Sequence, residues 1–255
     1  MLDAWLDLVH GARCVGCPAP GRSLCAACAA RLPLHGVPVR PTPSPDGLVA
    51  CFAAGEYDDL LRAMVLAHKE RGTFSLAGPL GDVLAVVVER AVRGIDRAGG
   101  SPALTVLVPV PSRPEVVRAR GHDPVLRFTR AAARRLRGSG RRVRVDQVLE
   151  QRGSVHDQSG LTAGQRAANL VGSMRVRPSA RAALARGGVP VSLLVCDDVL
   201  TTGATVREAQ RALEESGLPV RAVTTVAATR KRIPPGRAPS TPRSAPALPL
   251  SGGPV

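Results

Sequence analysis

The segment Leu193-Leu194-Val195-Cys196-Asp197-Asp198-Val199-Leu200-Thr201-Thr202-Gly203-Ala204-Thr205 combines three local signals. An apolar, partly β-branched run over 191–196 predicts a buried central strand, and a helical pattern begins at Val206. Two adjacent carboxylates and a loop of small residues lie between them. Open α/β sheets bind ligands at the carboxyl ends of their strands, so this segment predicts a site as well as a fold.

The loop after the two carboxylates has the chemistry of an anion site. Gly203 has no Cβ, so the backbone can turn sharply there and approach a ligand. The amides of Thr201, Thr202, Gly203, Ala204 and Thr205 face the amino end of the predicted helix, where free N–H groups and the helix dipole favour a phosphate.

Asp197 and Asp198 would repel a phosphate, and they suit ribose hydroxyls or a hydrated magnesium ion instead. Together with the loop they describe a site for a ribose 5-phosphate. The alternative is structural, in which Asp198 or Thr201 only caps the following helix.

This segment resembles the phosphoribosyl pyrophosphate (PRPP) signature of type I phosphoribosyltransferases. The resemblance implies an α/β fold with a mostly parallel sheet flanked by helices. It also implies that Asp197 and Asp198 are catalytic residues and that Thr201, Thr202, Gly203, Ala204 and Thr205 bind the ligand.

Four cysteines near the amino end form two C-x-x-C pairs, Cys14/Cys17 and Cys25/Cys28. Four thiolates in this arrangement favour a tetrahedral structural zinc site. The alternatives are a disulfide pair, which a cytoplasmic location disfavours, and a redox motif, which the doubled pattern disfavours.

Composition limits the classes of protein and partner. The 255 residues carry a formal net charge of +15, which points to anionic partners such as nucleic acid. The only lysines are Lys69 and Lys231 among many arginines, however, so part of the charge reflects compositional bias. Aromatic residues make up only 2% of the chain. The aromatic side chains on which single-strand binders stack bases are therefore nearly absent.

We expect four regions: a helix and zinc knuckle over 1–35, a Pro-rich linker over 36–47, the main domain over 48–230 and a disordered tail over 231–255. There is no long apolar run or basic leader, so we expect a cytoplasmic protein without a membrane span. The expected helices are 2–10, 58–69, 80–94, 124–137 and 206–216, and the expected strands are 48–55, 104–111, 143–149, 191–196 and 220–227.

Two further segments bear on the site. Arg118 and Arg120 follow the strand at 104–111, where forked guanidiniums suit a pyrophosphate; the alternative is a solvated basic helix start. The polar segment 151–172 is long for a connection. It predicts either a lid that excludes water or an ordinary surface loop.

The cysteine pairs, residues 108–111 with 118–121, residues 158–161 with 166–170, and residues 195–203 occur in the order typical of the ComF family. The resemblance covers about residues 1 to 230. Members join a zinc knuckle to a type I phosphoribosyltransferase domain, which implies zinc, magnesium and PRPP as ligands. In some bacteria the family is linked to competence and DNA uptake, with single-stranded DNA and a helicase as partners.

The chain departs from the family pattern at His122-Asp123-Pro124, where an aromatic residue, Asn and Gln are usual. Pro124 lacks an N–H, and Asp123 adds negative charge beside the expected pyrophosphate site. Two functions therefore stay open: phosphoribosyl transfer to an unidentified acceptor, and a non-catalytic adaptor in natural transformation.

Overall fold

The computed structural model describes residues 13–99, 104–152, 170–186 and 190–229. The predicted helix 2–10, most of the segment 151–172 and the tail 231–255 lie outside the described residues.

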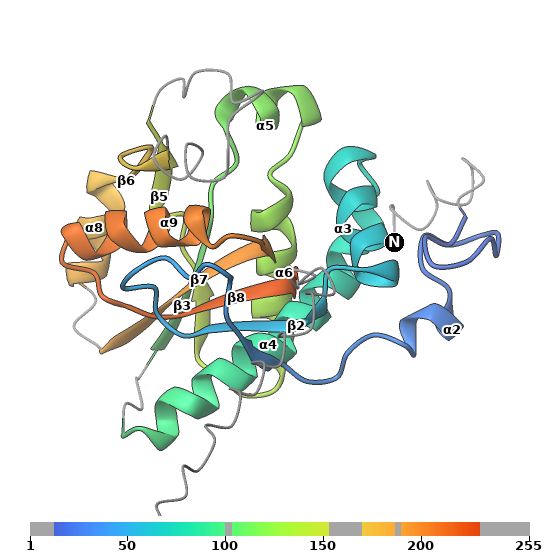
Figure 1. Cartoon of the computed structure of the whole chain (residues 1–255), viewed down its shortest axis with the longest axis horizontal. Helices are drawn as coiled ribbons and strands as arrows, with labels where there is room; N and C mark the ends of the chain where they lie inside the picture. Colours follow the sequence, from blue (N-terminus) through green and yellow to red (C-terminus); the bar gives the residue numbers. More distant parts are fainter. Residues whose placement is uncertain (1–12, 100–103, 153–169, 187–189, 230–255) are drawn as a thin grey trace, which may run out of the picture.

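The centre of the molecule is a six-stranded sheet in the order β1-β2-β8-β7-β3-β4 (Figure 1). Its strands are β1 (Val37–Val39), β2 (Cys51–Glu56), β3 (Leu104–Pro109), β4 (Val143–Val145), β7 (Val191–Leu200) and β8 (Val220–Ala228). Only the edge pair β1–β2 is antiparallel; the other four pairs are parallel. The expected α/β class with a mostly parallel sheet is confirmed. A separate antiparallel pair joins β5 (Leu149–Gln151) to β6 (Met174–Val176).

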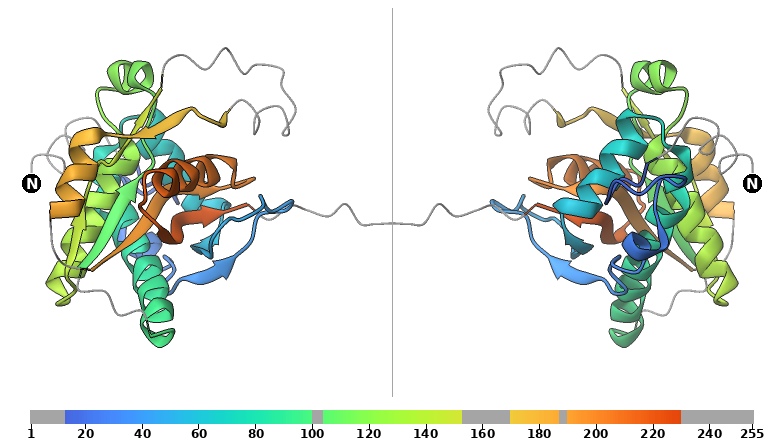
Figure 2. Two further views of the ribbon diagram at one scale, coloured as in Figure 1. Left: turned by 90° about the vertical axis from the view of Figure 1, so that its left-hand side faces the viewer. Right: turned by 90° about the vertical axis from the view of Figure 1, so that its right-hand side faces the viewer.

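Helices cover both faces of the sheet (Figures 1 and 2). The helices among the described residues are α2 (Ala26–Ala29), α3 (Asp59–Glu70), the 3-10 turn η1 (Phe74–Leu76), α4 (Ala77–Arg97), α5 (Pro114–Arg120), α6 (Pro124–Gly138), α8 (Pro178–Arg186) and α9 (Ala204–Glu215). Leu194 and Cys196 of β7 pack with α3, α4 and α6, whereas Leu193 and Val195 pack with α8 and α9. The continuous apolar run follows from this, because successive side chains of a strand point to opposite faces.

The order of the strands creates a crevice between β3 and β7. The chain leaves β3 through α6 on one face to reach β4, and it leaves β7 through α9 on the other face to reach β8 in the opposite direction. Crossovers in opposite directions from neighbouring strands define a topological switch point, where ligands of open α/β sheets bind.

The amino-terminal cysteine segment packs on α3. Its short helix α2 lies on the same side of the molecule as α3 (Figure 1). A Cβ placed on Gly16 would lie 2.6 Å from Leu60 Cδ1 and 2.9 Å from Cys28 Sγ, so a larger residue there would force these side chains to shift. Ser75 Oγ also donates a hydrogen bond to Ser23 Oγ at 2.8 Å. The cysteine segment and the α/β domain therefore share one packed boundary.

Several elements differ from the expectations. The strand expected over 143–149 is two short strands, β4 in the main sheet and β5 in the small one. The expected linker 36–47 contributes the edge strand β1. These three-residue strands form because a partner strand from elsewhere in the chain pairs with them. A segment of three residues is too short for a hydrophobic period to be recognised in its sequence.

Candidate functional site

Asp197 and Asp198 lie where β7 extends past its neighbour β3. The β3–β7 pairing ends at Pro109 and Cys196, whereas β7 remains paired with β8 as far as Leu200. The chain after Pro109 turns away, and this leaves the two aspartates along an open edge at the switch point. Both residues are buried, at 8% exposure each.

The two carboxylates differ in their partners. Asp198 Oδ2 accepts a hydrogen bond from Lys69 Nζ at 2.7 Å, and its Oδ1 accepts one from the Val199 amide, also at 2.7 Å. Asp197 Oδ1 accepts only the Asp198 amide, at 2.9 Å, among the contacts of the described residues. Asp198 is thus neutralised by a lysine that Asp197 does not contact.

Burial has the largest effect on the ionisation of Asp197. Its burial, and then the negative charge of Asp198, raise the pKa of the Asp197 carboxyl to about 8. Burial alone would lower the pKa of Lys69, but the charges of Asp198 and Asp197 outweigh it and raise that pKa. Burial therefore favours the neutral form of Asp197, while Lys69 keeps its proton beside Asp198.

The loop after β7 leads directly into α9. Gly203 is the residue before the helix and has a φ of +75°, in the left-handed region that favours glycine. A Cβ there would also lie 3.0 Å from Pro41 and 3.1 Å from Leu48, so the proline-rich segment packs against this turn. Thr201 and Thr202 are exposed, while Ala204 and Thr205 are half-buried.

A cavity of about 550 Å³ opens beside the two aspartates, and we call it the carboxylate cavity. Its lining brings together Asp197, Asp198, Thr201 and Thr205 from the predicted site with Arg120. The other predicted residues, Thr202, Gly203, Ala204 and Arg118, are not part of this lining. The remaining lining residues are Tyr57, Val65, Leu66, Lys69, Glu70, Val110, Pro111, Ser112, Arg113, Val116, Val125, Gln151 and Val199.

The two predicted arginines occupy different positions. Arg118 is exposed on α5. Arg120 is half-buried, and its Nη2 donates to both carboxylate oxygens of Glu70, at 2.8 and 2.7 Å. Arg113, at the start of α5, is a second guanidinium of the carboxylate cavity. An anionic ligand that binds the Arg120 guanidinium has to share this guanidinium with the Glu70 carboxylate.

The departure at residues 122–124 has a structural explanation. Pro124 is the first residue of α6, where its missing N–H is no loss, and Asp123 is the N-cap. Asp123 Oδ1 accepts the Leu126 amide at 3.0 Å and Oδ2 accepts the Ser112 amide at 3.2 Å. Its carboxylate therefore fixes the α6 start against the loop after β3.

The four cysteines form a compact cluster. One sulfur atom from each of Cys14, Cys17, Cys25 and Cys28 lies within 4.8 Å of all the others. Cys17 and Cys25 are 3.6 Å apart, too far for a disulfide, and all six cysteines of the chain are free thiols. Zinc with Zn–S bonds of about 2.3 Å separates its sulfur ligands by about 3.8 Å, so the cluster is compatible with zinc.

Thiol ionisation within this cluster is uneven. Burial opposes ionisation of Cys14, but hydrogen bonds from the Cys25 and Gly16 backbone and from neighbouring thiols outweigh it and lower the pKa to about 6. Burial and the neighbouring cysteines raise the pKa of Cys28 to about 12. Four thiolates cannot coexist here without a cation among them, which is the condition that a metal ion meets.

No model of a protein family matches the chain, and no curated protein matches it. Among the described residues, no helix has both the length and the apolar character needed to cross a membrane.

Polar residues of the carboxylate cavity that were not among the predicted site residues include Lys69, Tyr57 and Gln151, the last of which begins the segment predicted as a lid or surface loop. Lys69 ends a helix whose apolar face was predicted, and no local pattern places it opposite Asp198. Its rarity was the available signal, because it is one of only two lysines in an arginine-rich chain. Gln151 donates from Nε2 to the Pro111 carbonyl at 3.0 Å, which is a contact between distant segments.

Proposed function

We propose that the carboxylate cavity binds PRPP or a related 5-phosphorylated ribose. The observation that carries this proposal is that Asp197, Asp198, Thr201 and Thr205 line a single cavity at the switch point of a parallel sheet. Carboxylates bind vicinal hydroxyls, and a loop before a helix binds phosphate, so adjacent groups of both kinds suit this ligand. By the motifs of its sequence, we propose that the chain is a type I phosphoribosyltransferase-like protein of the ComF family.

The proposal gives each group a role. The ribose 2- and 3-hydroxyls donate to Asp197 and Asp198, and the 5-phosphate accepts from the amides and hydroxyls of residues 201–205. Arg113 and Arg120 are the nearest guanidiniums of the cavity for a pyrophosphate group. Tyr57 and Val65 close the apolar side.

Magnesium fits the chemistry of this donor set. The side-chain oxygens of Asp197 and Asp198 are the hard ligands it prefers, and burial together with the negative charge of Asp198 raises the pKa of Asp197, so a cation bound between them would favour its ionised form. When bound, the ion neutralises the phosphate charges of the ligand. For the cysteine cluster we propose structural zinc, held by Cys14, Cys17, Cys25 and Cys28.

Transfer, if catalysed, breaks the bond from the anomeric carbon to pyrophosphate, and the oxygen keeps the electron pair. A nucleophilic atom of the acceptor forms the new bond and gives up its proton. Positive charge develops on the ribose ring, beside the aspartates, and negative charge develops on the leaving group. Arg113 and Arg120 supply positive charge on that side of the cavity.

One observation favours the non-catalytic alternative. Glu70 occupies Arg120 through both of its oxygens, and Asp123 takes the Ser112 amide after β3. The guanidinium of Arg120, which was expected to hold pyrophosphate, therefore already has a protein partner, and so does a backbone amide in the loop after β3. The protein then binds the ligand as a sensor or as an adaptor in DNA uptake, with single-stranded DNA and a helicase as partners. A cytoplasmic location remains a prediction from the sequence, and these partners remain predictions from the resemblance.

Calorimetric titration of PRPP with magnesium tests the proposal on the wild type and on Asp197→Asn/Asp198→Asn. We expect binding that the double variant loses. The matched control is Asp82→Asn, because Asp82 is a half-exposed carboxylate outside the carboxylate cavity, and it should bind like the wild type. Wild-type protein that binds no PRPP at millimolar concentration contradicts the proposal. Pyrophosphate release with a panel of nucleobases then separates transfer from binding alone.

A further inference from the structure

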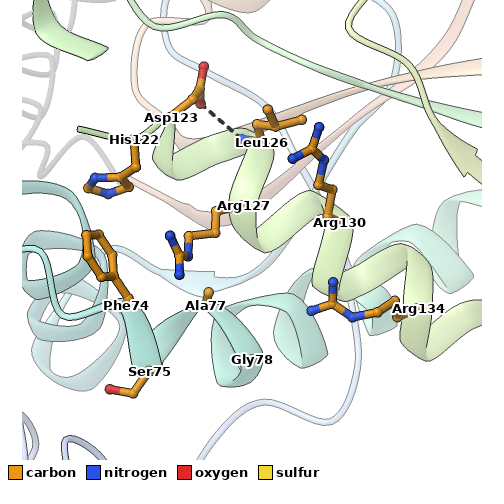
Figure 3. Close-up of a pocket in the computed structure, with 10 residues that line it drawn as sticks. All are labelled: Phe74, Ser75, Ala77, Gly78, His122, Asp123, Leu126, Arg127, Arg130 and Arg134. Carbon is orange, nitrogen blue, oxygen red and sulfur yellow. Dashed lines mark hydrogen bonds between the residues drawn. The ribbon is translucent and has the colours of Figure 1, made fainter. Parts of the chain in front are cut away.

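A second cavity, of about 720 Å³, lies between α6 and the beginning of α4 (Figure 3). It shares no lining residue with the carboxylate cavity. The lining residues are Phe74, Ser75, Ala77, Gly78, His122, Asp123, Leu126, Arg127, Arg130 and Arg134. We call it the arginine cavity.

Three arginines follow one another along the α6 side of this cavity. Arg127, Arg130 and Arg134 are three and four residues apart, so they share one face of the helix (Figure 3). In the described parts of the chain, none of the three forms an ion pair, whereas the neighbouring Arg135 lies 3.6 Å from Asp82. These guanidiniums are placed side by side without the carboxylates that would neutralise them.

Negative charge in the described lining comes only from Asp123. Both of its oxygens accept backbone amides, those of Leu126 and Ser112, so the carboxylate is directed to the helix start. The arginine cavity therefore has a net positive charge that an anion of more than one charge would balance.

The end of the cavity near the α6 start is formed by flat groups. The Arg127 guanidinium carbon lies 4.3 Å from the centroid of the Phe74 ring, and His122 meets that ring edge-on at 4.6 Å. His122 is buried, and its ring nitrogens lie 3.1 Å from the Arg120 carbonyl oxygen and 3.3 Å from that of His68. This end is rigid and planar, whereas Arg130 and Arg134 are exposed. Aromatic rings and guanidinium planes are the surfaces on which nucleobases stack.

The wall opposite the arginines leaves room for a ligand. Ala77 and Gly78 begin α4 there, and a Cβ added at Gly78 would have no atom within 4 Å. A volume of about 720 Å³ lies within the range of small-molecule sites.

We propose that the arginine cavity binds a phosphorylated nucleoside, with its phosphates on Arg130 and Arg134 and its base toward Phe74 and Arg127. The shared chemistry is a planar base joined to phosphate, and it comes either from a free nucleotide or from a unit of a single strand. This inference is independent of the function proposed for the carboxylate cavity.

Binding of three probes to the full chain at low salt tests this assignment: ATP, a single-stranded thymidylate oligomer and adenosine. The variants are Arg134→Ala and the control Arg135→Ala, which removes the same charge from the next residue of the same helix but lies outside the cavity. We expect Arg134→Ala to weaken phosphorylated probes by about fivefold or more, and Arg135→Ala by less than about twofold. ATP binding identifies the free nucleotide as the source, and binding of the oligomer alone identifies the strand. Equal weakening in both variants, equal affinity for adenosine, or no binding of either phosphorylated probe would overturn the proposal.

Gly78→Glu gives a second test that a folding defect cannot imitate. Glutamate in the first turn of α4 favours the helix and the helix dipole, so we expect the melting temperature to be maintained or raised. The same carboxylate would enter the arginine cavity and compete with the ligand phosphates. A stable Gly78→Glu protein that binds the probes like the wild type contradicts the assignment.

Discussion

Asp197→Asn removes the carboxyl group whose pKa burial and the charge of Asp198 raise to about 8. Asparagine has the same shape, and its side-chain oxygen can still accept the Asp198 amide, which lies 2.9 Å away. The substitution therefore isolates the cost of ionising this buried site.

The sign follows from proton binding in the two states. Between pH 4 and pH 8 the folded protein keeps a proton on Asp197 that the unfolded chain has released, because the ordinary pKa of this carboxyl is 3.8. The free energy of unfolding of the wild type therefore falls as pH rises through this window. Each pKa unit corresponds to about 1.36 kcal/mol, so a shift of about four units sets an upper limit of about 6 kcal/mol. Rearrangement of Lys69 toward Asp197 lowers this cost, and we expect a gain of about 2 to 3 kcal/mol for Asp197→Asn at pH 8.

Urea unfolding followed by circular dichroism at pH 5, 6.5 and 8 measures this gain. The difference between Asp197→Asn and the wild type should grow with pH. Asp82→Asn is the control, since Asp82 is half-exposed and its loss should leave the pH dependence unchanged. Parallel curves for Asp197→Asn and the wild type, or a variant that becomes relatively less stable as pH rises, would refute the reasoning.

Three further substitutions test other parts of the structure. Cys25→Ser should lose zinc and lower the melting temperature. The control Cys51→Ser changes a thiol outside the cluster and should keep the metal. Zinc content is measured by atomic absorption, and equal zinc in both variants would contradict the assignment. Gly16→Ala should cost about 1 to 3 kcal/mol of unfolding free energy, because its methyl group would lie 2.6 Å from Leu60, and a neutral result would show that the cysteine segment moves freely on α3. Glu208→Ala should cost about 3 kcal/mol in urea unfolding, because this buried carboxylate accepts the Met174 amide and two Arg211 contacts; a loss under 1 kcal/mol would mean that water replaces them.

Long elements with strong local patterns were predictable from the sequence. The apolar run over 191–196, buried on both faces, gave the central strand, and the 3.6-residue periodicity gave α3, α4, α6 and α9 within a few residues. The spacing of the four cysteines predicted a cluster whose sulfur atoms do meet. These features depend on local sequence, so each can be recognised from a single short segment.

Features that depend on distant segments were not predictable. Three-residue strands such as β1 and β6 form only because a partner strand is present, and no period is readable over that length. Lys69 reaches Asp198 across 129 positions of the chain, and Glu70 engages Arg120 across 50. Of the two predicted arginines, only Arg120 lines the carboxylate cavity, because residues two positions apart in the short helix α5 point about 200° away from each other around its axis.

The location of the bound ligand tests the proposed function most directly. A crystal structure of the full chain with PRPP and magnesium should place the 5-phosphate on the loop 201–205 and the ribose hydroxyls on Asp197 and Asp198. The pyrophosphate should point toward Arg113 and Arg120. A ligand found only in the arginine cavity, or an empty carboxylate cavity at saturating PRPP, would contradict the account.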